Sequence, residues 1–106
     1  MGKLYRQGDV LLVATDMPGE TKPVKRTKRG LVLAEGEATG HAHVIEAPEA
    51  ELVTAAEAAE LYLLVHGTET VALTHEEHAT IDVPPGSYRV VGQREYSPQE
   101  IRRVAD

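Results

Sequence analysis

Short apolar runs, rich in branched side chains and separated by turn residues, constrain the fold of this chain more than any other feature. Examples are residues 8–14 (GDVLLVA), 61–66 (LYLLVH) and 87–93 (SYRVVGQ). Branched side chains favour extended backbone, and runs of this length match single strands better than helices. Turn residues such as those at 84–86 (PPG) separate the runs. The pattern predicts a mainly β fold, either a small barrel or a sandwich.

Three further segments carry local structural signals. Residues 48–60 are rich in Ala and Glu and contain a Thr and a Glu at capping-box spacing, so they fit a short helix or an irregular connection. Gly67 and Thr68 predict a hairpin turn between two strands. Near the end of the chain, Ser97 fits a helix N-cap and Pro98 the first helical position. We therefore expect a short C-terminal helical turn.

Length and composition indicate one small domain, residues 1–106, with an aliphatic core. The chain has 42% hydrophobic residues but no Phe, Trp or Cys, so disulfides, thiolate metal sites and cysteine nucleophiles are excluded. No apolar run is long enough for a membrane helix, and the first residues lack a signal-peptide pattern. We expect a cytoplasmic protein without membrane contact.

The charge is unevenly distributed along the chain. The net charge of −6 favours solubility and disfavours general nucleic-acid binding. Five basic residues nevertheless fall in one short stretch, which fits an exposed loop or edge strand and is the place where phosphate contacts could form. These residues are Lys22, Lys25, Arg26, Lys28 and Arg29. No aromatic residues interleave with them, so the stretch lacks side chains that would stack on bases.

The five histidines offer the sharpest functional hypothesis. His41 and His43 are two residues apart, so on a strand both imidazoles lie on one face and could bind one metal ion together. Glu46 would face the other way on an unbroken strand and could join them only across a bend. His75 and His78 are three apart, which places both on one face of a helical turn.

Together these side chains form the candidate metal site, and the capping-box spacing of Thr74 and Glu77 makes a helical turn around the second pair plausible. If the two segments meet in space, the imidazoles and a carboxylate would suit Zn, Fe, Mn, Ni or Cu. The alternative is that the histidines are surface residues or hydrogen-bonded partners that hold loops. The candidate ligands are His41, His43, His75, His78 and Glu46.

Part of the pattern resembles the cupins, small β-barrels that bind a metal ion inside. The resemblance covers the HxH at 41–43 and the Pro-x-Gly turn at 84–86. It departs from the family because Gly36 and Glu46 are each closer to the histidines than the family spacing requires. In addition, Arg89 stands where the family has a later His. The resemblance implies a cupin-like barrel and leaves its fourth metal ligand in doubt.

A longer resemblance covers nearly the whole chain but implies no chemistry. The strings YRQGDVLL, GEATGHAH, LTHEEHATIDVPPGSYRV and QREYSP are similar to a set of small bacterial and phage-type proteins without assigned activity. It implies a shared compact fold in which these segments belong together. The segment QGDVLLV is also similar to the opening strand of small SH3-like barrels.

Three functions remain open from the sequence. The first is a metal-binding β domain, whose catalytic version would use Glu46, Glu76 or Glu77 as a base for a metal-bound water. The second is a non-enzymatic assembly or accessory subunit that forms a homo-oligomer or docks on a protein partner. The third is a nucleic-acid-associated barrel that uses the basic stretch. No recognisable catalytic motif is present, so the catalytic residues are unknown and we lean against an enzyme.

Overall fold

Ten strands and no helix occur in residues 3–35, 40–55 and 60–92, the part of the chain that this computed structural model describes. Turn residues separate the strands, as the apolar runs predict. The strands are β1 (Leu4–Gln7), β2 (Val10–Ala14), β3 (Thr21–Pro23), β4 (Leu31–Glu35), β5 (Ala42–Ile45), β6 (Ala50–Ala55), β7 (Leu61–Val65), β8 (Val71–Thr74), β9 (Ile81–Val83) and β10 (Gly86–Gly92).

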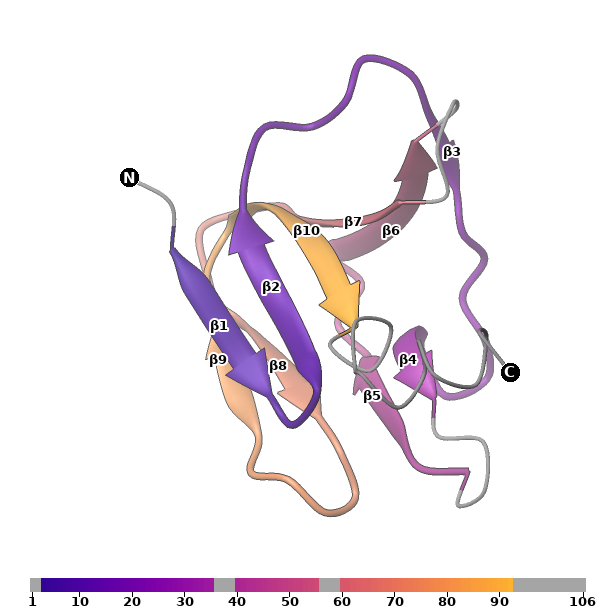
Figure 1. Ribbon diagram of the computed structural model, residues 1–106, viewed down its shortest axis with the longest axis vertical. Coiled ribbons are helices and arrows are strands. Elements are labelled where there is room, and N and C mark those ends of the chain that lie inside the picture. The colour runs from indigo at the N-terminus through magenta and orange to yellow at the C-terminus, as the bar shows by residue number, and fades with distance from the viewer. Residues whose placement is uncertain (1–2, 36–39, 56–59, 93–106) are drawn as a thin grey trace, which may run out of the picture.

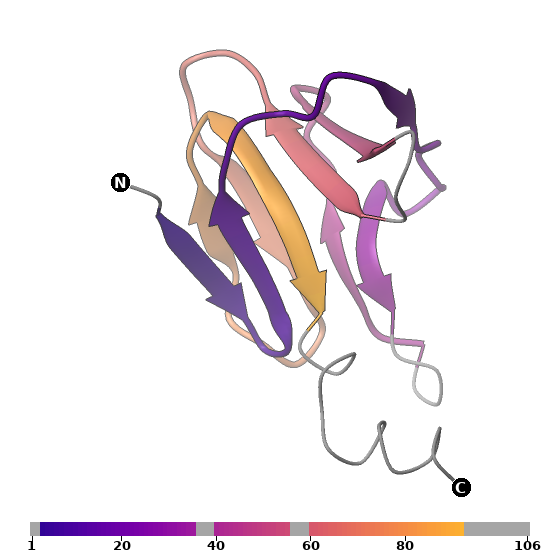
Figure 2. The ribbon, with the colours of Figure 1, turned by 45° about the horizontal axis from the view of Figure 1, so that its top comes forward.

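The strands form two antiparallel sheets. The first has six strands in the order β1-β2-β10-β7-β6-β3, and the second has four in the order β4-β5-β8-β9. Figures 1 and 2 show β8 and β9 behind β1, β2 and β10, with β4 and β5 to the side of them. The described strands do not close into a barrel, so the sandwich is the architecture that applies and the barrel expectation is wrong here.

An aliphatic core fills the space between the sheets. Leu12 and Leu63 from the six-stranded sheet and Ile45 and Leu73 from the four-stranded sheet have no exposed surface. Alternation along the strands produces this arrangement: in β2, for example, Val10 and Leu12 are buried while their neighbours are partly exposed. Successive side chains on a strand point to opposite faces, so every second apolar residue meets the other sheet.

A tight hairpin joins β1 to β2 and bears directly on the site described below. Gln7 pairs with Val10, so Gly8 and Asp9 are the two turn residues. Gly8 has a φ of +60°. A type II′ hairpin turn requires such a positive φ at its first central position, and glycine adopts it without a side-chain clash.

Three local expectations were wrong. Residues 50–55 form a strand instead of a helix, because they pair with both β7 and β3. Residues 67–68 are not a hairpin turn: β7 pairs with β6 and β10, whereas β8 lies in the other sheet. Residues 76–78 form bends, and no helical turn occurs at 75–78. In each segment long-range pairing decides the conformation over local propensity.

The mainly β fold is confirmed. The expected C-terminal helical turn lies outside the described residues. No helix long and apolar enough to cross a membrane occurs in the described ranges.

Candidate functional site

Four of the five imidazoles lie together at one end of the sandwich. His41 and His43 come from the start of β5, and His75 and His78 from the loop between β8 and β9. The ring centres of His75 lie 4.4 Å from His43, 4.5 Å from His78 and 5.8 Å from His41. In Figure 1 the β8–β9 loop and the β1–β2 turn lie at this same lower end. The fold therefore brings together two histidine pairs that are more than thirty residues apart.

Gln7 fixes the orientation and the tautomer of His43. Its side-chain amide nitrogen donates to the backbone oxygens of Leu73 (2.8 Å) and Ala79 (2.9 Å). The amide oxygen of Gln7 must therefore accept, and it lies 2.8 Å from Nδ1 of His43. Nδ1 then carries a hydrogen, so the lone pair of the neutral ring is on Nε2. Both side chains are buried, with 3% and 4% of their surface exposed.

The lone pair of His43 faces a carboxylate. Nε2 lies 3.3 Å from Oδ1 of Asp9 in the β1–β2 turn. Burial lowers the pKa of His43, and repulsion from His75 acts in the same direction, while Asp9 opposes both. At neutral pH the ring is therefore mostly neutral, and two hydrogen-bond acceptors lie opposite each other. A cation between them, either a proton or a metal ion, would bind to both.

The other three imidazoles are less firmly held. Nδ1 of His75 accepts the backbone N–H of Glu77 at 3.0 Å, so its neutral ring carries hydrogen on Nε2. His41 is partly exposed, and its Nδ1 lies 3.4 Å from the carboxylate of Glu77. His78 is exposed and lies against Gly8.

The four imidazoles and the nearby carboxylates lie close together but do not form a preorganised metal site. Within the described ranges, no group of three or more His, Asp or Glu side chains is arranged to hold a metal as it stands. His75 would have to give up its bond to Glu77 before either ring nitrogen could act as a ligand. Metal binding by this cluster stays a prediction.

Glu46 lies on the other side of β5 from His43, and Glu76 lies in the β8–β9 loop. Glu46 follows β5 and shares a depression of about 360 Å³ with Ala42 and Val44, which alternate with His43 along the strand, and with Glu76 and His75. The carboxylate of Glu76 accepts the backbone N–H of Ala42 at 2.9 Å. That bond is the main reason why the pKa of Glu76 is lowered. Glu46 therefore lies where an unbroken strand places it, with its side chain directed away from His43.

A family model described as a domain of unknown function (DUF8820) matches residues 6–93. The chain belongs to this family. No curated protein and no solved structure matches it. The matched residues include both histidine pairs and the β1–β2 turn, so the cluster lies inside the DUF8820 domain. The resemblance to domains without assigned activity is confirmed at this level, and an origin in bacteria or phages stays a prediction.

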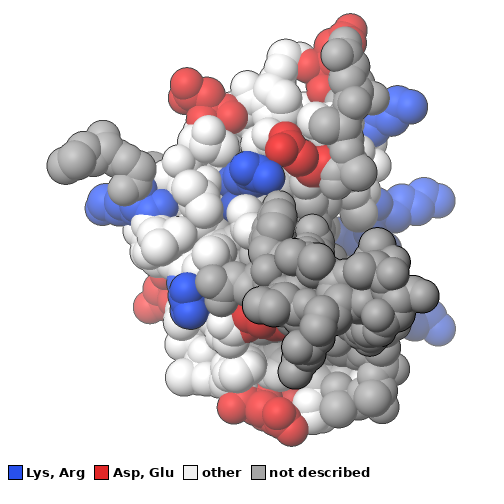
Figure 3. Space-filling model, viewed as in Figure 1, with Lys and Arg blue, Asp and Glu red and all other residues white. Residues whose placement is uncertain are grey.

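The basic stretch of the DUF8820 domain is partly engaged in its own fold. Arg26 donates to the backbone oxygens of Ala47 (2.7 Å) and Ala50 (2.6 Å). Arg29 pairs with Glu76 at 2.7 Å and with Glu35 at 3.5 Å. Blue and red side chains are also interspersed on the face shown in Figure 3. These two arginines have structural roles, although all five basic residues of the stretch are exposed.

His66 lies apart from the cluster. It follows β7 and its Nε2 contacts the carboxylate of Glu51 on β6. The strand register explains the separation, because β7 ends beside Gly86 at the start of β10, whereas the β1–β2 turn lies beside Gly92 at its end. His66 is exposed and supplies a matched control for the cluster.

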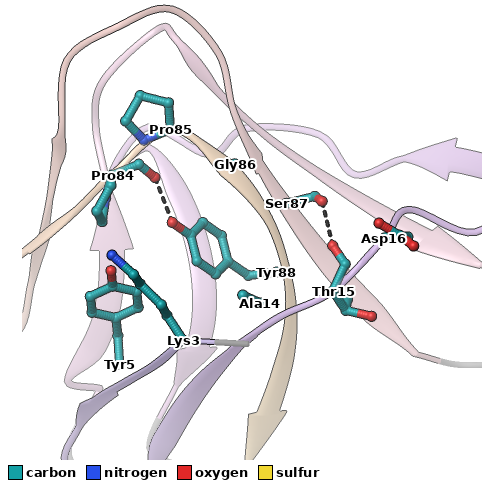
Figure 4. A pocket seen from close by; sticks show the side chains of 10 residues that line it. All are labelled: Lys3, Tyr5, Ala14, Thr15, Asp16, Pro84, Pro85, Gly86, Ser87 and Tyr88. Atoms are coloured by element: carbon teal, nitrogen blue, oxygen red, sulfur yellow. Dashed lines mark hydrogen bonds between the residues drawn. The ribbon is translucent and has the colours of Figure 1, made fainter. Parts of the chain in front are cut away.

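A larger cavity, about 540 Å³, lies at the opposite end of β1 and β2. Figure 4 shows Tyr5 and Tyr88 on its wall and two hydrogen bonds across it. The hydroxyl of Tyr88 donates to the backbone oxygen of Pro84 at 2.7 Å, and that of Ser87 donates to Thr15. The first bond joins β10 to the β9–β10 turn, and the second joins the start of β10 to the residue that follows β2. The cavity contains none of the histidines.

Sequence reasoning missed Gln7, Gly8 and Asp9, all of which contact the cluster in this DUF8820 domain. A Gly-Asp pair between two extended segments is a known hairpin signal, so the turn itself could have been recognised. Its proximity to the histidines could not, because it depends on how the two sheets pack.

Proposed function

We propose that the end of the sandwich formed by the β1–β2 turn, the start of β5 and the β8–β9 loop binds one divalent transition-metal ion. His43 and Asp9 would be the fixed ligands, and His78 would join them from the loop. His75 and His41 are additional candidate ligands. One observation supports this above the others: the lone pair of the buried His43 faces the Asp9 carboxylate inside a group of four imidazoles.

The donor chemistry supports a transition metal. Neutral imidazole and carboxylate together suit Zn, Fe, Mn, Ni and Cu. Histidine ligands in metal sites usually donate their second ring nitrogen to a neighbouring oxygen, which fixes the ring and raises its basicity. Gln7 gives His43 this arrangement. Burial also lowers the pKa of His43, so the ring is mostly deprotonated at neutral pH and protons compete little with a metal ion for it.

Ring spacing supports a site that closes by side-chain rotation alone. Two imidazoles on one ion, each with a metal–nitrogen distance of about 2.1 Å, have ring centres roughly 5 Å apart. The observed separations run from 4.4 Å (His43–His75) to 6.0 Å (His43–His78). The buried ring is held by Gln7, whereas His78 is exposed and can rotate. Binding therefore requires no change in strand pairing.

Metal titration tests the proposal. Untagged protein stripped of metal is titrated with Zn²⁺, Co²⁺ and Ni²⁺ by calorimetry. We expect one ion per chain, and His78→Ala weakens binding by more than about tenfold, the loss seen when even an outer-shell partner is removed. His78 is exposed, so this variant should fold, and far-UV circular dichroism checks that it does.

His66→Ala is the matched control, because it removes an exposed histidine that lies outside the cluster. It should bind as the wild type does. The proposal is wrong if the wild type binds none of the three ions, or if His66→Ala weakens binding as much as His78→Ala.

A further inference from the structure

Each residue of the β1–β2 turn region contacts the histidine cluster. Gln7 accepts from His43 Nδ1, Gly8 lies against His78, and Asp9 faces His43 Nε2. The same Gln7 amide donates to Leu73 on β8 and to Ala79 just beyond His78. The turn of the six-stranded sheet is therefore bonded to both ends of the loop that carries His75 and His78.

Gly8 permits the closest of these approaches. A Cβ atom at this position would lie 2.4 Å from Nε2 of His78 and 2.8 Å from its Cδ2. Contacts this short do not occur between non-bonded atoms, so any larger residue forces the ring away. His78 is exposed and can move, which means that a substitution at Gly8 displaces the imidazole without disrupting the core.

We propose that the β1–β2 hairpin forms one wall of the metal site. Docking of the hairpin against the β8–β9 loop and metal binding are therefore coupled. This inference rests on the proposed function. Asp9 supplies the carboxylate, Gln7 is a positioning residue for His43, and the absence of a side chain at Gly8 lets His78 lie beside the turn. Coupling of this kind is reciprocal: what displaces the hairpin weakens metal binding, and bound metal stabilises the hairpin.

The position of β1 makes the coupling measurable. Among the described strands, β1 lies at the edge of its sheet and pairs with β2 alone. Its Leu4 is 60% exposed. Beyond its pairing with β2, the described contacts of this strand include the Gln7 bonds to Leu73 and Ala79 and the Tyr5–Tyr88 ring pair. Amide hydrogens of an edge hairpin exchange readily, so stabilisation by a bound ion should appear there first.

Gly8→Ala is the central test. We expect it to weaken Zn²⁺ binding by about tenfold or more, because His78 can no longer lie beside the turn. Gly67→Ala is the matched control: Gly67 also has a positive φ, +85°, but no atom lies within 4 Å of the added Cβ. Both variants place a side chain at a positive φ, so the control accounts for this kind of backbone strain in general. Gly8→Ala in addition displaces His78 and strains the turn that carries Gln7 and Asp9, whereas Gly67 lies away from both.

Hydrogen exchange gives the second readout. Saturating Zn²⁺ should slow exchange of the amides in residues 3–14 of the wild type and of Gly67→Ala, and much less in Gly8→Ala. The coupling is wrong if Gly8→Ala binds Zn²⁺ as tightly as Gly67→Ala, or if Zn²⁺ leaves exchange in residues 3–14 unchanged. Failure of the wild type to bind any ion would instead overturn the proposed function, so the two failures are distinguishable.

Discussion

Gln7 and His43 are the only buried polar side chains in the described part of the chain, and they satisfy each other. No buried side-chain nitrogen or oxygen there lacks a hydrogen-bond partner. An unsatisfied buried polar group costs about 1–3 kcal/mol, so the bond between the Gln7 oxygen and His43 Nδ1 and the two bonds of the Gln7 amide nitrogen lower the cost of burying this pair. A neutral amide and a neutral imidazole can be buried at the edge of the core, whereas a protonated imidazole there would have a larger desolvation cost.

The pH dependence of stability follows from His43. Its pKa is lowered in the folded protein, while an unfolded histidine titrates near its ordinary value of about 6.5. Below that value the unfolded chain binds a proton that folded His43 does not, so the free energy of unfolding decreases as the pH falls from about 6.5. Above it this contribution is constant.

Urea denaturation of metal-free protein between pH 5 and 8 measures the effect. If the free energy of unfolding increased as the pH fell through this range, the lowered pKa of His43 would be contradicted.

At the scale of elements, side-chain hydrogen bonds hold connections between strands whose pairing cannot be read from the local sequence. Arg26 binds three backbone oxygens, those of Glu46, Ala47 and Ala50, and so holds the connection from β5 to β6. From the sequence alone Arg26 belongs to a basic run with the same charge as its neighbours. Only the folded chain distinguishes a structural arginine from solvated lysines.

Arg26→Ala should therefore destabilise the protein, by about 1–2 kcal/mol, since charged donors to backbone oxygens contribute roughly this much. Lys28→Ala, a nearby exposed basic residue, should change the free energy of unfolding by less than about 0.5 kcal/mol. Denaturation midpoints of the two variants check the difference. Equal effects would mean that the hydrogen bonds of Arg26 contribute nothing to stability beyond its charge.

At the scale of the whole molecule, the candidate site exists only when the two sheets pack. Asp9 and Gln7 belong to the six-stranded sheet, and His43 to the four-stranded sheet. The aliphatic core between the sheets holds these groups at their distances. Loss of core packing should therefore weaken both the fold and the cluster.

Leu63→Ala tests this dependence on the core. Leu63 is fully buried on β7, and a leucine-to-alanine change at such a position costs about 2–5 kcal/mol. Leu4→Ala removes the same atoms from an exposed position and should cost less than about 0.5 kcal/mol. Thermal unfolding of both variants measures the contrast. Similar losses would show that Leu63 does not pack as described.

The sequence by itself determined several of the strands and the shared face of one histidine pair. Branched runs such as 10–14 form strands because side-chain preference and alternation act within a few residues. The spacing of His41 and His43 likewise places both rings on one side of β5, and leaves Glu46 on the other.

The tertiary structure decided which strands pair and which groups meet the histidines. Residues 50–55 became a strand because β7 and β3 flank them, and residues 67–68 join two sheets instead of two paired strands. Gln7 and Asp9 reach His43 across more than thirty residues of chain. Such contacts depend on the packing of whole sheets, a long-range outcome that no local spacing encodes.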